Sequence, residues 1–228
     1  MDVNTDQAQP AEDTAWRTQL LAAIAQLPEK VTLPYEYTPE GQRMEGFKRV
    51  CPEKFMHRIR RELLPDPVAF DCVALWDGSF PGPMAFGGAD TAKTRATWSA
   101  LGRLYVKHNK PFAWFPIKRL LTEMAGYDES GNLHEFFRKY SHFPVLMVDD
   151  CEKFNWDFGS NAELLFSFYD WIYREERPCI STSNKDAEWF AEKAGDGVAR
   201  RLFKDGHFAV HFSTPQEREQ SRQKTKTT

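Results

Sequence analysis

The feature that most constrains this chain is residues 83–94, where a short apolar run enters a glycine turn. The run leads into Gly87-Gly88, and the pair Lys93-Thr94 opens a helical pattern. A strand, a glycine loop, a Lys-Thr pair and a helix follow one another in this order in a phosphate-binding P-loop. Backbone N–H groups and the helix dipole make such a loop attractive to phosphate. We therefore predict a nucleotide site here, against the simpler alternative of an ordinary strand-to-helix turn.

Eight consecutive residues of this stretch are candidates for binding ATP: Gly87, Gly88, Ala89, Asp90, Thr91, Ala92, Lys93 and Thr94. Lys93 would reach the β- and γ-phosphates, and the Thr94 hydroxyl would bind Mg²⁺. Ala92 stands where the P-loop pattern has its second glycine. Its methyl group crowds the loop only if this residue needs a positive φ or very close phosphate approach. The departure therefore bears on efficient turnover more than on binding.

Residues 145–148 are four apolar residues that run into Asp149 and Asp150. Such a run is typical of a buried parallel strand, whose carboxyl end delivers side chains to the ligand crevice of an open α/β sheet. We expect Asp149 to hold Mg²⁺ and Asp150 to orient or deprotonate the attacking water. A strand that ends in an Asx-turn gives the same string, so the assignment depends on the Lys93-Thr94 pair upstream.

Two later segments carry polar side chains that could complete the site. The strand-like residues 178–184 end in Asn184, which could hydrogen-bond the γ-phosphate or the attacking water. The alternative is that this segment supplies a helix N-cap. Further on, Arg200 and Arg201 lie in a helical turn that precedes a last strand at residues 207–212.

Composition limits the kinds of protein that this chain can be. Its 228 residues are 41% hydrophobic and carry a net charge of −3, which suits one α/β domain and excludes general nucleic-acid binding by a basic surface. The four cysteines form no C-x-x-C pair, which argues against a zinc site and a disulfide framework. We find no signal peptide or membrane-spanning run. These features predict a cytoplasmic protein with no membrane partner.

We predict three segments. Residues 1–46 are a polar segment, a short helix at Trp16–Leu27 and a linker at Val31–Met44 that is rich in proline and glycine. Residues 47–213 form the folded domain, which begins with a basic amphipathic helix around Lys54–Arg61. Residues 214–228 are polar without apolar periodicity, so we expect a disordered tail.

The P-loop, the Asp149-Asp150 strand end, the strand end at Asn184 and the Arg-Arg-Leu sequence resemble those of AAA+ ATPases. More narrowly, they are similar to the bacterial and phage helicase-loader group, the DnaC-like and IstB-like ATPases. This resemblance covers residues 47–212. It implies that residues 87–94 are Walker A and Asp149 and Asp150 are Walker B. It also implies that Asn184 is sensor 1, and that Arg201, with Arg200 as the alternative, is an arginine finger.

The resemblance implies a three-layer α/β/α P-loop fold with a central, mostly parallel sheet and no C-terminal lid domain. It implies ATP and Mg²⁺ as cofactors, an ATP-dependent homo-oligomer, and the loading or remodelling of a replicative DNA helicase on single-stranded DNA. In this group a helical insertion after the second strand contacts DNA. That insertion would lie at Ile117–Tyr140, where we place the DNA contacts on Lys118 and Arg119.

Three other functions stay open from the sequence. A transposase-partner ATPase of the same group would share every motif quoted above. A nucleoside or small-molecule kinase would need a mobile basic lid, for which we find no segment. A degenerate scaffold would bind nucleotide without hydrolysing it, or bind none, and Ala92 is the residue that supports it.

Overall fold

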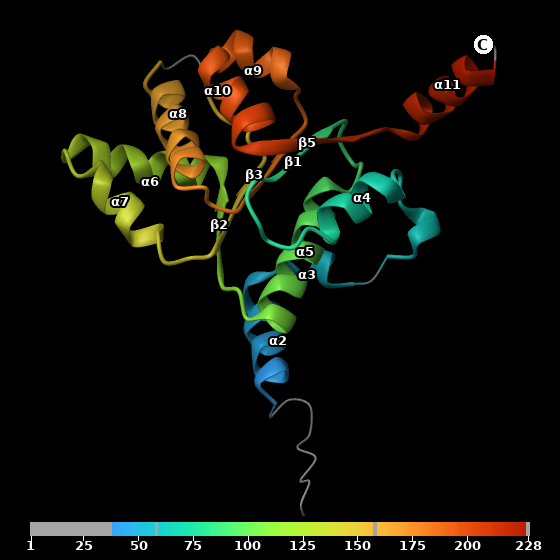
Figure 1. Cartoon of the computed structure of the whole chain (residues 1–228), viewed down its shortest axis with the longest axis horizontal. Coiled ribbons are helices and arrows are strands. Elements are labelled where there is room, and N and C mark those ends of the chain that lie inside the picture. The colour runs from blue at the N-terminus through green and yellow to red at the C-terminus, as the bar shows by residue number, and fades with distance from the viewer. Residues whose placement is uncertain (1–37, 58, 157–158, 227–228) are drawn as a thin grey trace, which may run out of the picture.

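A five-stranded parallel sheet forms the centre of the computed structural model, which describes residues 38–57, 59–156 and 159–226 (Figure 1). The strand order is β2-β3-β4-β1-β5, and every pair of neighbours is parallel. The strands are β1 (Gly82–Gly87), β2 (Phe112–Pro116), β3 (Val145–Asp149), β4 (Cys179–Ser183) and β5 (His207–Phe212). The chain crosses from β1 to the far edge at β2, and β3 and β4 then fill the gap. The carboxyl ends of β1, β3 and β4 therefore lie side by side.

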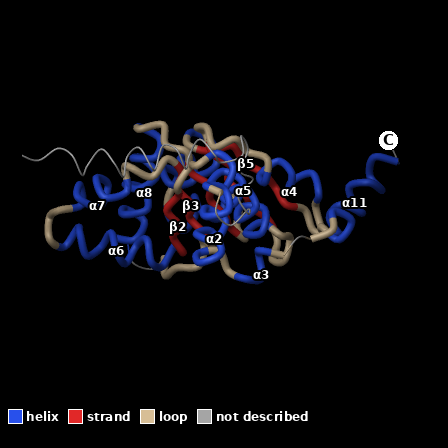
Figure 2. The backbone as a smooth tube through the Cα atoms, turned by 90° about the horizontal axis from the view of Figure 1, so that it is seen from below, coloured by secondary structure: helices blue, strands red, loops and turns tan. Residues whose placement is uncertain are grey.

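Helices cover both faces of the sheet, which confirms the predicted three-layer fold (Figures 1 and 2). One face carries α6 (Ile117–Glu129), α7 (Leu133–Tyr140), α8 (Gly159–Arg174), α9 (Ala187–Ala194), α10 (Asp196–Arg200) and a π-helical turn, η3 (Arg201–Asp205). The other carries α2 (Pro39–Val50), α4 (Pro67–Ala74) and α5 (Lys93–His108), with the short α3 (Glu53–Met56) and η2 (Arg61–Leu63) beside them. Among the described residues, one buried apolar cluster fills the first side of the sheet and two fill the other. None of the helices in the described ranges has the length and apolarity to cross a membrane.

The second strand lies at the edge of the sheet, although a strand of nearly all apolar residues is typical of a sheet centre. In β2 the residues alternate between partly and fully buried, while all five residues of β3 are buried. The partly buried side of β2 is apolar because α2 and α5 cover it. The Phe112 ring lies 6.2 Å from that of Phe47 and 6.0 Å from that of Trp98.

Helix α2 occupies much of the predicted linker, so the prediction of a linker was wrong from residue 39 onward. The Thr38 hydroxyl caps the helix by accepting a hydrogen bond from the Gly41 N–H at 3.0 Å, and Pro39 takes the first helical position. Phe47 then packs against Trp98, with 6.0 Å between the ring centroids. The predicted domain boundary at residues 46–47 therefore falls inside a helix that belongs to the core. The predicted helix at Trp16–Leu27 lies outside the described residues.

The predicted basic helix around Lys54–Arg61 is not one helix in the structure. Helix α3 ends at Met56, and the backbone at His57 and Arg60 is extended before the single turn of η2. Arg95 on α5 explains the path of the chain, because its guanidinium donates hydrogen bonds to the Lys54 and His57 carbonyls. The two carbonyls thus accept hydrogen bonds from a side chain of α5 instead of from backbone N–H groups of a longer helix.

The polar tail also contains a helix, α11 (Pro215–Lys226), where the sequence predicted disorder. The Thr214 N–H donates to the Glu217 carboxylate at 2.7 Å, and the Glu217 N–H donates to the Thr214 hydroxyl at 3.3 Å. This reciprocal pair is a capping box, and Pro215 stands at the first helical position. Arg218 also donates a hydrogen bond to the Pro65 carbonyl. The helix extends away from the body of the molecule (Figures 1 and 2).

Candidate nucleotide-binding site

The loop after β1 has the backbone of a phosphate-binding loop. Gly87 has φ of 130°, and a Cβ atom there would lie 2.3 Å from the Phe212 carbonyl oxygen on β5, so only glycine fits. Helix α5 begins at Lys93 directly after the loop, and no side chain caps it. The free N–H groups of its first turn therefore face the loop, where they can bind an anion.

Ala92 adopts the backbone conformation that favours glycine, with φ of 73° and ψ of 19°. This is the condition under which the methyl group was expected to matter. An L-residue in the left-handed region costs about 1–2 kcal/mol relative to the right-handed one. Asp90, in the same loop, also has a positive φ, of 58°. The loop therefore holds two non-glycine residues in a strained conformation, as functional loops often do.

Lys93 folds back into the loop and holds it together. Its ammonium donates hydrogen bonds to the carbonyls of Gly87 at 2.9 Å and Gly88 at 2.6 Å, and to the Thr91 hydroxyl at 3.2 Å. Burial lowers the pKa of Lys93, and the nearby carboxylates, of which Glu152 acts most strongly, work in the opposite direction. All three of its protons are used, so Lys93 must exchange these bonds to reach a phosphate.

Thr94 and Asp149 meet although they are far apart in the chain. The Thr94 hydroxyl donates to the Asp149 carboxylate at 3.1 Å, and the Thr182 hydroxyl on β4 donates to the same oxygen at 2.6 Å. Burial raises the pKa of Asp149, and the Thr182 hydrogen bond acts against that shift. A hydroxyl and a carboxylate side by side are the hard oxygen ligands that Mg²⁺ prefers.

Asp150 lies in a tight turn just after β3, with φ of 58°. Its N–H donates to the Thr182 hydroxyl at 2.9 Å, and its carboxylate pairs with the Lys153 ammonium at 2.9 Å. The side chain is 40% exposed. Thr182 thus fixes both Asp149 and the backbone of Asp150, a role that the sequence analysis gave to no residue. Thr182 could have been identified from the rule that neighbouring parallel strands, here β3 and β4, bring their carboxyl ends together.

Asn184, the predicted sensor residue, contacts a carboxylate that the sequence analysis did not single out. Its Nδ2 donates to the Glu152 Oε1 at 2.6 Å. Glu152 follows Asp150 by two residues, and the other oxygen of its carboxylate is buried. An acidic residue close after the Asp149-Asp150 pair was the available signal, but the sequence alone does not say which way its side chain points.

The two arginines of the predicted finger differ in their surroundings. Arg201 is 19% exposed, donates to Asp170 at 2.9 Å and Asp205 at 2.8 Å, and covers the Tyr173 ring. Arg200 also pairs with Asp205, at 2.9 Å, but it is 67% exposed. In the described part of this single chain, neither arginine forms a hydrogen bond with the P-loop.

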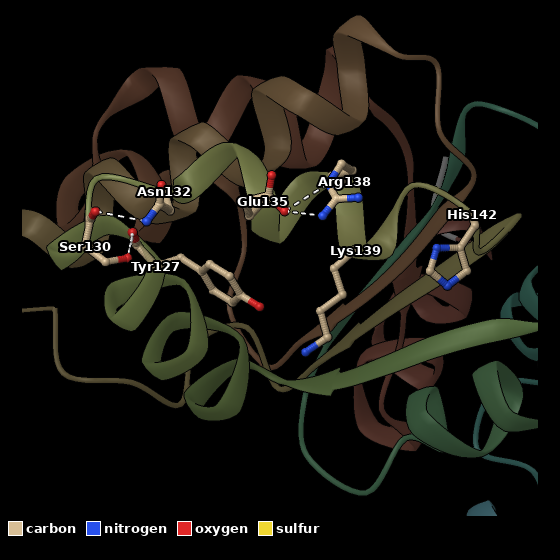
Figure 3. Close-up of a pocket in the computed structure, with 7 residues that line it drawn as sticks. All are labelled: Tyr127, Ser130, Asn132, Glu135, Arg138, Lys139 and His142. Carbon is tan, nitrogen blue, oxygen red and sulfur yellow. Dashed lines mark hydrogen bonds and ion pairs between the residues drawn. The ribbon is translucent and has the colours of Figure 1, made fainter.

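The predicted DNA contacts lie at the start of α6, where Lys118 and Arg119 are exposed. Within the described ranges neither forms an ion pair, whereas the basic residues of α7 are paired. Arg138 binds Glu135, and Lys139 binds Glu123 on α6 at 2.8 Å. Figure 3 shows the polar pocket of about 520 Å³ between α6 and α7, in which dashed lines join Arg138 to Glu135. It is lined by Tyr127, Ser130, Asn132, Glu135, Arg138, Lys139 and His142.

Several solved structures have a fold similar to that of this chain. The DnaC helicase loader gives a TM-score of 0.57 at 15% sequence identity, over 71% of this chain and 100% of that chain. DnaI gives 0.54 at 15% identity, over 72% of this chain and 95% of that chain. The replication initiator DnaA, bound to AMPPCP and single-stranded DNA, gives 0.53 at 16% identity, over 69% of this chain.

The match to that DnaA structure spans 50% of its chain. The sequence itself matches no protein-family model and no curated protein. At these identities the likeness shows the fold alone. The chain therefore has the AAA+ P-loop fold that the DnaC helicase loader, DnaI and DnaA share.

Proposed function

We propose that this chain binds and hydrolyses ATP and that it loads or remodels a replicative DNA helicase on single-stranded DNA. The observation that carries the proposal is the contact between Thr94, directly after the P-loop, and Asp149 at the end of β3. It unites a phosphate-binding loop with a carboxylate suited to Mg²⁺. The likeness to a helicase loader and to an initiator bound to AMPPCP and single-stranded DNA supports the role in replication.

In this proposal the loop N–H groups and Lys93 hold the phosphates, and Thr94 with Asp149 holds Mg²⁺. The described residues contain no cluster of three or more His, Cys, Asp or Glu side chains that could hold a metal. Phosphate oxygens of the nucleotide would therefore be further ligands of the ion. Bound Mg²⁺ would neutralise charge that develops on the phosphates. Asp150 and Glu152 are the carboxylates that could orient the attacking water. Binding and positioning supply the catalysis, with no covalent intermediate.

An arginine from a neighbouring subunit would complete the site in an ATP-dependent homo-oligomer. Arg201 and Arg200 are the two candidates, and the exposed side chain of Arg200 is freer to reach a second subunit. Turnover should therefore be slow in the monomer and rise when DNA and helicase assemble the subunits.

The nucleotide site is tested by measuring ATP affinity in wild-type and Lys93→Ala proteins. We expect Lys93→Ala to abolish measurable binding, because the cation that faces the β- and γ-phosphates is lost. Lys48→Ala is the matched control, since Lys48 is exposed and pairs with Glu45. Equal affinity in wild type and Lys93→Ala would refute the P-loop assignment. Tight binding without turnover, even with DNA and helicase, would favour the scaffold function instead.

The DNA contact is tested by replacing Lys118 and Arg119 together with alanine. Each lost phosphate contact should flatten the salt dependence of single-strand binding by about 0.7 in log K against log salt. ATP affinity should stay unchanged. The matched control replaces Arg138 and Lys139, whose charges are compensated by glutamates, and should have a smaller effect. Unchanged single-strand affinity and slope in the first variant would place the DNA path elsewhere.

A further inference from the structure

Glu152 is a partly buried carboxylate of the site whose surroundings suit a ligand. Asn184 holds one of its oxygens at 2.6 Å, and the Trp156 indole N–H donates to its backbone carbonyl at 3.1 Å. The other oxygen, Oε2, is buried and accepts no hydrogen bond from any residue in the described ranges. A buried acceptor without a donor is unfavourable, and more so when it is charged. A water molecule bound at this oxygen would supply the donor.

Asp150, the other carboxylate that could orient the attacking water, differs from Glu152 in its partner and its exposure. Its carboxylate is paired with Lys153 at 2.9 Å, and the side chain is 40% exposed. Its charge is therefore both compensated and screened by solvent. Of the two carboxylates, Glu152 is therefore the one with a buried oxygen that no donor in the described residues meets, and this oxygen can accept a hydrogen bond from a water molecule.

Glu152 also lies on the phosphate side of the site. It follows the end of β3 and contacts Asn184 just after β4, the strand that pairs with both β3 and β1. Lys93 is the residue that would contact the β- and γ-phosphates. Because β1 leads directly into the P-loop, the Glu152 carboxylate lies at the same edge of the sheet as the loop that would hold the phosphates.

We propose that Glu152, held in position by Asn184, orients the attacking water and accepts its proton. This inference rests on the proposed ATPase function. The water oxygen forms a bond to the γ-phosphorus, and the bond from that phosphorus to the β–γ bridging oxygen breaks. The bridging oxygen keeps the electron pair and leaves as part of ADP, while the proton of the water passes to the Glu152 carboxylate and then to solvent. In this scheme Asn184 acts on hydrolysis through Glu152.

The test is Glu152→Gln, assayed for ATP affinity and for turnover with DNA present. Glutamine keeps an oxygen that can accept from Asn184 but cannot take up the proton, so the variant should fold normally, as a melting curve would show. A positioned general base contributes about 10²–10⁴-fold, so we expect kcat to fall at least 100-fold. The Kd for ATP should stay within threefold or decrease, because a negative charge near the phosphates is lost. Glu188→Gln, at an exposed position on α9, should behave as wild type.

A double-mutant cycle separates this role from a merely structural one. Asn184→Ala should lower kcat at unchanged ATP affinity, and the double variant should be no slower than Glu152→Gln alone, because the two residues act as one unit. Additive losses would overturn the coupling. Turnover of Glu152→Gln within threefold of wild type, above all beside an inactive Asp150→Asn, would overturn the role of Glu152 while leaving the ATPase proposal intact. A wild-type chain that binds no ATP would overturn both.

Discussion

Replacing Ala92 with glycine should stabilise the protein. The residue has φ of 73°, where an alanine costs about 1–2 kcal/mol and a glycine costs little. Glycine also lowers the free energy of unfolding by about 0.5–1 kcal/mol, because it gives the unfolded chain more conformational freedom. The net gain is therefore roughly 0.5–1 kcal/mol. For a chain of this size, about 1 kcal/mol shifts the melting temperature by roughly 2–4 °C.

Urea unfolding of wild type and Ala92→Gly, without nucleotide, measures this gain directly. Glu176→Gly is a matched control, since Glu176 is exposed and has a φ of 48° far from the P-loop. The free energy of unfolding of Glu176→Gly should rise by a similar amount. That of Ala125→Gly, inside helix α6, should instead fall by about 0.5–1 kcal/mol. ATP binding by Ala92→Gly should be as tight as in wild type or tighter. A destabilised Ala92→Gly would refute the left-handed loop, and a weaker ATP affinity would mean that the loop changes conformation when nucleotide binds.

Two further predictions concern His207 and the paired arginines. Burial lowers the pKa of His207 to about 4, against an ordinary value of 6.5, so the unfolded chain takes up the proton first. The contribution of His207 to the free energy of unfolding is therefore fully present above about pH 6.5, and up to roughly 3 kcal/mol is lost as the pH falls toward 4. Urea unfolding at pH 7 and pH 5 should show a smaller loss of stability in His207→Asn than in wild type. Arg201→Ala should destabilise the chain because it removes a largely buried guanidinium that bridges two carboxylates and covers the Tyr173 ring. Arg200→Ala should change stability by less than about 1 kcal/mol, because that arginine is mostly exposed. A loss of turnover in Arg200→Ala at unchanged stability would identify Arg200 as the arginine that acts in trans, and full turnover would exclude it.

Local sequence signals were sufficient to predict the loop, and the layered fold followed from the resemblance that the motifs carry. The stretch from Gly87 to Thr94 specifies its strand end, turn and helix start within a few residues, and the structure has each of them there. The Asp149 position followed from a second rule, that parallel strands end at the same edge of the sheet. Neither inference depends on a contact that has to be known in advance.

The errors in the prediction come from features that tertiary packing decides. An apolar strand is typical of a sheet centre, but β2 is equally apolar at the edge because Phe47 and Trp98 cover it. Glu152 was missed because the direction of its side chain depends on the turn after β3, where Asp150 has a positive φ. The helix at Pro215 was missed because composition was given more weight than the capping box.

The balance of charge in the site explains why the proposed activity should depend on assembly. Asp90 lies in the P-loop, Asp149 contacts Thr94, and Asp150 and Glu152 follow directly after β3. Lys93 is the cation in the loop itself, and the nearby Lys153 is already paired with Asp150. A triphosphate brings further negative charge into this partly desolvated region, where repulsion is stronger than in water. Lys93 must also give up its carbonyl partners to meet the phosphates. In the proposed ATPase, binding and turnover would therefore draw on positive charge from outside the chain, which Mg²⁺ at Thr94 and Asp149 and an arginine from a neighbouring subunit would supply.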